Sequence, residues 1–137
     1  MSAVRDIEYF YKNANHVELD FYKAFGNGDF FLMEALIADD GVCYTHAGEG
    51  TVIGRQNVID HWNLILDGIP QITIKRELLN VTQGDDVEIH LILESHICNE
   101  AESEMSFTYT TNTYIRQGNG WRLQMQHASQ PFKRSLD

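Results

Sequence analysis

The segment NGWRLQMQHASQPF, residues 119–132, contains the clearest strand pattern in the chain. Counting from Trp121, every second residue is Trp, Leu, Met, His and Ser, and the positions between them are mostly polar. A period of two is typical of a strand that has one face against a core. The pattern therefore predicts that Trp121, Leu123, Met125 and His127 face the same way, which places a histidine in line with apolar residues.

The segments before it predict further long strands. They lie at 70–83, 87–98 and 105–117, and the polar sequences GDD, NEAES and GNG separate them from one another and from the last strand. Consecutive long strands joined in this way predict a curved antiparallel sheet. The even-numbered positions of 87–98 are the more polar ones, so we expect His90 and His96 to face solvent or a partner chain.

The first half of the chain is predicted to be mainly helical. An apolar stripe with spacings of three and four runs from Ile7 to Ala24, and the sequence GNGD then ends this helix. Asp29 is placed to cap the next helix. The elements expected here are helix, helix, strand and helix, at residues 7–24, 30–37, 42–46 and 55–66, with HAGEGTVIG as a glycine-rich loop before the last. Together with the strands, this order predicts one α+β domain over residues 1–137, with helices on one face of the sheet.

Composition excludes several classes of function. The net charge of −10 and the pI of about 4.9 argue against a nucleic-acid partner and against an anionic membrane surface. The chain has no secretory signal and no apolar run of transmembrane length, so we expect a cytoplasmic protein. No dinucleotide or phosphate fingerprint is present, so no cofactor is expected. The histidines and Glu49 lack a ligand spacing, so no metal site is expected either.

Three segments carry a resemblance to a known family: YTHAGEGTVIGRQNVIDHW (44–62), TTNTYIRQGNGWRL (110–123) and QHASQP (126–131). They resemble the SnoaL-like branch of the nuclear transport factor 2-like superfamily, which also includes ketosteroid isomerases. The resemblance implies a cone-shaped fold, in which a curved antiparallel sheet is roofed by three helices. It also implies a pocket for a small, largely apolar molecule. Ketosteroid isomerases have a catalytic Asp where this chain has Thr45, so isomerase activity is not expected to carry over.

The resemblance also suggests which residues act in the pocket. The expected ligand contacts are Tyr44, Trp62, Asn112, Trp121 and Met125. We expect His46 and His127 to be the acid–base groups, because histidine titrates near neutral pH and both match the family motif in line with apolar strand residues. Tyr44 or Asn112 would then donate a hydrogen bond to a developing oxyanion. The alternative is that both histidines are structural and are satisfied inside the core.

Two classes of function stay open on the sequence. The first is an enzyme of the cyclase, isomerase or hydratase kind that uses histidine acid–base chemistry on a small molecule. The second is a non-catalytic module for ligand binding or oligomerisation, because domains of this fold include the association domain of a calmodulin-dependent kinase. In either case we expect a homodimer that pairs through the polar, even-numbered face of the sheet.

Overall fold

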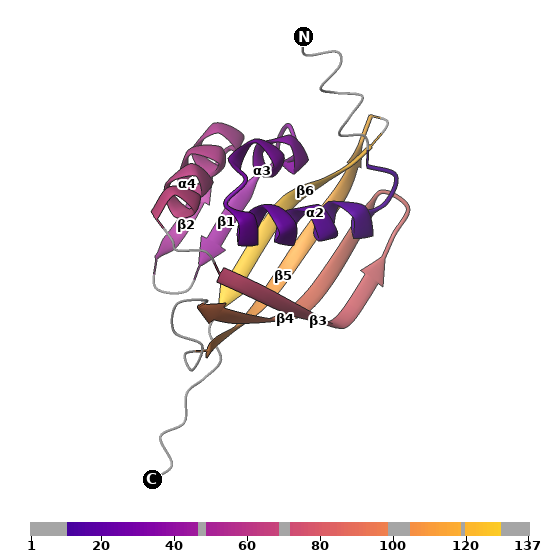
Figure 1. Cartoon of the computed structure of the whole chain (residues 1–137). Helices are drawn as coiled ribbons and strands as arrows, with labels where there is room; N and C mark the ends of the chain where they lie inside the picture. The colour runs from indigo at the N-terminus through magenta and orange to yellow at the C-terminus, as the bar shows by residue number, and fades with distance from the viewer. Residues whose placement is uncertain (1–10, 47–48, 69–71, 99–104, 119, 130–137) are drawn as a thin grey trace.

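The computed structural model describes residues 11–46, 49–68, 72–98, 105–118 and 120–129. Within them the chain forms three helices and six strands (Figure 1): α2 (Ala14–Asn27), α3 (Phe30–Leu36), β1 (Cys43–His46), β2 (Gly50–Ile53), α4 (Arg55–Gly68), β3 (Ile72–Gln83), β4 (Val87–Cys98), β5 (Met105–Gln117) and β6 (Gly120–Ser129). The predicted beginning of the first helix, at Ile7 and Phe10, lies outside the described residues.

The six strands form one sheet in the order β2-β1-β6-β5-β4-β3. Neighbouring strands are antiparallel except for β1 and β6, which run parallel. Helix α2 lies across one face of the sheet, and α3 and α4 pack near its β1 and β2 end (Figure 1). This arrangement confirms the predicted α+β cone. Strand β2 was not predicted: part of the glycine-rich loop pairs with β1, from Cys43 opposite Ile53 to His46 opposite Gly50.

Local chemistry sets the ends of the first two helices. The Asn13 side chain accepts a hydrogen bond from the backbone N–H of His16 at 2.9 Å and caps the beginning of α2. Gly28 ends α2 with φ of 68°, a left-handed conformation that glycine adopts without strain. Asp29 accepts from the backbone N–H of Leu32 at 3.1 Å, which confirms its predicted role as the cap of α3.

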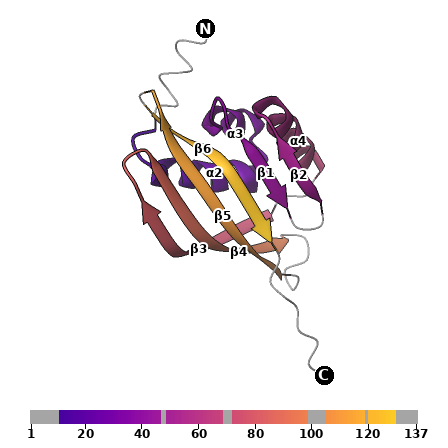
Figure 2. The same ribbon diagram turned by 180° about the vertical axis from the view of Figure 1, so that it is seen from behind.

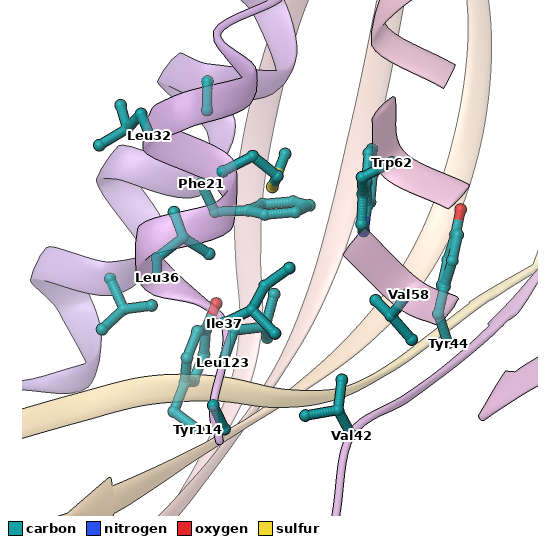
Figure 3. Close-up of a cluster of buried hydrophobic side chains, with 14 of the residues drawn as sticks. Phe21, Leu32, Leu36, Ile37, Val42, Tyr44, Val58, Trp62, Tyr114 and Leu123 are labelled. Carbon is teal, nitrogen blue, oxygen red and sulfur yellow. The ribbon is translucent and has the colours of Figure 1, made fainter. Parts of the chain in front are cut away.

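The hydrophobic core lies between the helices and the inner face of the sheet. Figure 3 shows Phe21 of α2 pointing toward Trp62 of α4, and the two ring centroids are 5.4 Å apart in an edge-to-face contact. Leu36, Tyr114 and Leu123 lie close by in the same cluster (Figure 3). All five side chains are buried, so this cluster fixes how α2, α3 and α4 sit over the strands.

A buried ionic cluster also holds α2 on the sheet. The Glu18 carboxylate is inaccessible to solvent and accepts hydrogen bonds from Arg76 at 2.7 Å, His90 at 2.7 Å and the Tyr114 hydroxyl at 2.8 Å. The second ring nitrogen of His90 lies 2.6 Å from Glu88. Burial alone would lower the pKa of His90, but the hydrogen bonds to the two glutamates outweigh it and raise that pKa. Each ring nitrogen of His90 contacts a carboxylate, an arrangement that the imidazolium form satisfies with two N–H donors.

The prediction that His90 and His96 face solvent or a partner chain is wrong. The even-numbered residues of β4 point to the helix-covered face, where His90 is 1% exposed and Glu94 is 3% exposed. Polar side chains can occupy this inner face because groups on α2 bind them. The odd-numbered residues of β4 point to the opposite face, where Val87 and Ile89 are exposed and the others are half-buried.

In the second half of β6, a β-bulge reverses which residues point inward and which point outward, compared with the prediction. Thr113 pairs with Met125, but Tyr114 pairs with Leu123, so the residue between them is an extra one. Before the bulge Trp121 and Leu123 are buried, as predicted, and after it Gln126 and Ala128 are buried instead. Met125 is 42% exposed and His127 is also exposed. The prediction that these two residues face the interior is wrong, because an alternation of two cannot show an inserted residue.

In the part of the chain that the structure describes, no helix has both the length and the apolar character needed to cross a bilayer.

Candidate functional site

A pocket of about 40 Å³ opens between α2, α4 and the inner face of the sheet. The volume exceeds that needed for a single water molecule but is well below that of a site for a drug-sized ligand. It therefore suits a ligand, or the end of a ligand, of only a few non-hydrogen atoms. Its walls come from one helix residue of α2, one of α4 and four strands: Phe25, Tyr44, His46, Trp62, Glu94, His96, Thr108, Thr110, Gln126 and Ala128.

Aromatic rings form one side of the pocket. Tyr44 stacks on Trp62 with 5.3 Å between ring centroids and an interplanar angle of 15°. Figure 3 shows the two rings side by side, one from β1 and the other from α4. Phe25 meets the edge of Trp62 at 5.1 Å and the ring of His96 at 5.7 Å. These contacts give the pocket an apolar wall whose ring faces carry partial negative charge.

A carboxylate–histidine pair of β4 also lines the pocket. His96 Nε2 is 2.8 Å from Glu94 Oε1, and the Tyr22 hydroxyl donates to Glu94 Oε2 at 2.6 Å. Because an ionised carboxylate only accepts, the proton between the pair belongs to His96 Nε2. In neutral His96 the lone pair is then on Nδ1, which has no partner within the described part of the chain. This is the arrangement of a histidine that a carboxylate orients for proton transfer.

A chain of hydrogen bonds extends from Glu94 across the sheet. Asn112 Nδ2 donates to the Tyr22 oxygen at 3.2 Å, and Gln126 Nε2 donates to Asn112 Oδ1 at 2.9 Å. Tyr22, Asn112 and Gln126 are all buried. Burial and the nearby Glu94 raise the pKa of the Tyr22 phenol well above its usual value, so its proton stays available to the carboxylate. The chain fixes the position of Glu94 from behind.

Tyr44 and His46 stand where β1 meets the pocket. Burial, followed by the charges of Glu49 and Glu94, raises the pKa of the Tyr44 phenol, so it is a neutral hydrogen-bond donor at physiological pH. His46 Nδ1 lies 3.6 Å from the Glu49 carboxylate, whose side chain is 59% exposed. His46 and His96 are similarly half-buried, with side chains 25% and 20% exposed, but the partner of His96 is a buried carboxylate whereas Glu49 is exposed.

The structure brings only some of the residues predicted from the sequence together. Tyr44, His46 and Trp62 line the pocket as expected. Asn112 and Trp121 are buried but do not line the pocket. Asn112 is connected to the pocket by its hydrogen bonds with Tyr22 and Gln126. Met125 and His127 do not line it either: Met125 only borders a separate, water-sized hollow of about 10 Å³, and His127 is exposed on the outer face.

Sequence reasoning missed Glu94 and His96, although a signal for them was present. The segment VEIHLILESHI contains the pattern Glu-x-His twice, at Glu88 and His90 and at Glu94 and His96. Residues two apart share a face of a strand, so each pair can form the hydrogen bond that the structure shows, at 2.6 and 2.8 Å. Among the described residues, no three His, Cys, Asp or Glu side chains are grouped so that they could hold a metal ion.

Comparison with known protein families identifies the family of the chain. The family model of the SnoaL-like domain matches residues 14–133, which is most of the length of the chain. The chain belongs to the SnoaL-like domain family. The match confirms the resemblance found in the sequence. No curated protein sequence matches this SnoaL-like domain significantly.

Solved structures similar to this SnoaL-like domain share its fold at low sequence identity. One, from Thiobacillus denitrificans, is provisionally named a calcium/calmodulin-dependent protein kinase type II association domain; it is 23% identical, covers 90% of this chain and 98% of its own, and has a TM-score of 0.85. A protein from Streptomyces avermitilis, provisionally named a dehydratase of the NTF2-like family, is 24% identical, with coverages of 87% and 94% and a TM-score of 0.78. The hexachlorocyclohexane dehydrochlorinase LinA-type3 from Novosphingobium barchaimii is 15% identical, with coverages of 85% and 82% and a TM-score of 0.70.

Proposed function

We propose that this SnoaL-like domain binds a small molecule in the pocket and catalyses a proton transfer on it, with Glu94 and His96 as the acid–base pair. The observation that carries the proposal is the 2.8 Å contact between the two side chains in the wall of a pocket. His96 replaces His46 and His127 as the group assigned to the proton, because its partner is a buried carboxylate. His46 has an exposed one, and His127 lies outside the pocket.

The proposed proton transfer follows from the tautomer of His96, in which Nε2 carries the proton and Nδ1 has the lone pair. Nδ1 of neutral His96 takes a proton from a carbon next to a carbonyl group, and the electron pair left behind moves onto the carbonyl oxygen. The Glu94 carboxylate stabilises the imidazolium that forms. The neutral Tyr44 phenol donates a hydrogen bond to the oxygen that gains charge. Where a double bond adjoins the deprotonated carbon, return of the proton to the far carbon of that double bond gives an isomerisation. Where the β-carbon carries a leaving group, the electron pair returns from the oxygen to form a double bond and the leaving group departs with its own pair, which is an elimination.

Two neighbours support this type of reaction. The names dehydratase and dehydrochlorinase both describe eliminations, in which a proton leaves one carbon while a group leaves another. Because they are only 24% and 15% identical to this chain, they share its fold and support a class of reaction, but they do not indicate a substrate. The pocket volume of about 40 Å³ points to a substrate whose reacting end has only a few non-hydrogen atoms.

The proposal is tested by hydrogen–deuterium exchange at carbon. A panel of small carbonyl compounds is incubated with the protein in D2O, and loss of the C–H signal is followed by NMR. We expect wild type to accelerate exchange for some members, and His96→Gln to lower that acceleration about a hundredfold. His127→Gln is the matched control and should behave as wild type. Loss of exchange in His127→Gln with full exchange in His96→Gln would contradict the assignment.

A second candidate function is self-association through the outer face of the sheet. Figure 2 shows β3 to β6 from this side, and no helix of the described chain covers it. The apolar side chains exposed there come from neighbouring strands: Val87, Ile89, Phe107, Tyr109 and Met125. An uncovered apolar sheet face favours an interface between protein chains. We therefore propose a homodimer that pairs through this face, and not through the even-numbered one, which the helices cover.

Sedimentation velocity tests the dimer. Phe107, 44% exposed, is replaced by Glu, which would place two negative charges near each other across a two-fold interface. We expect a dimer mass for wild type at micromolar concentration and a monomer mass for Phe107→Glu. Phe31→Glu is the matched control, because Phe31 is 69% exposed on α3 and should leave the dimer intact. A monomer mass for wild type would refute this second proposal.

A further inference from the structure

The hydrogen-bond chain behind Glu94 has a fixed direction, and this direction determines what the pocket offers a ligand. The single proton of the Tyr22 hydroxyl goes to the Glu94 carboxylate, so the Asn112 group that faces the Tyr22 oxygen must be its NH2. Asn112 then presents its carbonyl oxygen to Gln126, which must answer with its own NH2. The Gln126 carbonyl oxygen is consequently turned away from the chain, without a donor.

Two buried polar atoms of residues that line the pocket have no hydrogen-bond partner among the described residues. They are Gln126 Oε1 and Thr110 Oγ1, and their residues are 4% and 1% exposed. Both residues line the pocket. An unpaired polar atom at this depth is unfavourable, so a native site that retains two of them is suited to a ligand that supplies the missing donors. Gln126 Oε1 can only accept, which makes the ligand a hydrogen-bond donor.

The charge and the walls of the pocket favour a cation. Glu94 is the one carboxylate in the described lining, and no Lys or Arg side chain belongs to it. The aromatic rings of Tyr44, Trp62 and Phe25 line the pocket, and aromatic rings attract ammonium groups, as in sites that recognise alkylated ammonium ions. Glu49 at the solvent side adds a further negative charge near the entrance. An anion would meet the Glu94 carboxylate and the acceptor oxygen of Gln126, both of which repel it.

We propose that the pocket is selective for a small alkylammonium group, the N–H donors of which bind Gln126 Oε1 and Thr110 Oγ1 while the aromatic wall and Glu94 stabilise its charge. This inference rests on the proposed function, because it names the ligand class of the same pocket. It implies that the substrate carries an amino group beside the carbon on which His96 acts. Thr110 and Gln126 are thereby assigned as residues that determine ligand specificity. Their positions in the sequence do not indicate this role.

The test compares three probes of nearly equal shape: propylammonium, 1-propanol and propanoate. Each is titrated into the wild-type protein near neutral pH at constant ionic strength, and the side-chain NMR signals of Trp62 and His96 report binding. We expect propylammonium to bind about tenfold or more tightly than 1-propanol, and propanoate to show no saturable shift. The ranking uses wild type alone, so it does not depend on whether a variant folds.

Two variants with the same change in net charge separate the pocket from the general negative charge of the protein. Glu94→Gln should weaken propylammonium about tenfold or more and leave 1-propanol within about threefold. Glu77→Gln, on an exposed position of β3, should leave both affinities unchanged. Gln126→Met, which removes the free acceptor at similar size, should also weaken propylammonium about tenfold.

The possible failures are distinguishable. Binding of 1-propanol or propanoate at least as tight as that of propylammonium would overturn the ammonium inference and leave the pocket as a small-molecule site. An equal loss of affinity in Glu94→Gln and Glu77→Gln would also overturn it, because the attraction would then be nonspecific. Absence of any shift at Trp62 and His96 with all three probes would overturn both this inference and the proposed function.

Discussion

Replacing Tyr114 with Phe removes one hydroxyl group from the interior and leaves the ring that packs in the core. That hydroxyl donates to the buried Glu18 carboxylate at 2.8 Å, and Tyr114 has no solvent-accessible surface. Hydrogen bonds to charged groups contribute about 1.5–3 kcal/mol. Because Glu18 keeps Arg76 and His90 as partners, no charge is left unpaired. We therefore expect Tyr114→Phe to lower the free energy of unfolding by about 2 kcal/mol.

Urea denaturation near neutral pH measures this effect, provided that the slope against urea is the same for both proteins. Tyr109→Phe is the matched control, because it makes the same chemical change on the outer face at a residue that is 42% exposed. We expect the control to change the free energy of unfolding by less than about 0.5 kcal/mol. If the two variants lose the same amount of unfolding free energy, the buried cluster does not anchor α2 to the sheet, and the positions of Phe25 at the pocket and of Tyr22 behind Glu94 have another cause.

Three further predictions concern stability. The raised pKa of His90 means that the stabilisation by its protonated ring is complete below about pH 6.5 and is lost as the pH rises through the folded-state pKa. The difference in unfolding free energy between wild type and His90→Gln should therefore shrink as the pH rises above about 6.5, and a constant difference would contradict it. Trp62→Ala, at a fully buried position of α4, should cost about 3–5 kcal/mol in a urea titration, whereas Leu64→Ala, 73% exposed on the same helix, should cost less than about 1 kcal/mol. Asp29→Ala should cost about 1 kcal/mol through loss of the α3 cap, and Asp29→Asn, which keeps the acceptor, should restore most of it.

Much of the fold follows from local sequence signals. The stripe of α2, the GNGD stop, the Asp29 cap and the turns between the last strands act over a few residues, so they can be recognised without the tertiary structure. Strand β2 was missed because its four residues lie between glycines and carry no alternation of their own. It becomes a strand only by pairing with β1.

The site was harder to predict because two long-range effects reverse the usual pattern. The first is the pairing of β4 with α2: Glu18 and Tyr22 bind side chains that are 72 residues away in the chain, which lets the polar residues His90 and Glu94 of β4 point inward. The second is the bulge in β6, which turns His127 outward and Gln126 inward. Periodicity alone assumes that apolar residues are inside and that no residue is inserted, and both assumptions fail at this site.

The assignment of the pocket and of the Glu94–His96 pair is tested most directly by the side-chain signals of the histidines. In a protein labelled with carbon-13 in histidine, the ring signals are recorded while small molecules of a few non-hydrogen atoms are added, neutral and charged in turn. We predict that compounds that bind shift the ring signals of His96 and leave those of His127 unchanged. Saturable shifts at His127 with none at His96 would contradict the assignment and return the site to the outer face of the sheet.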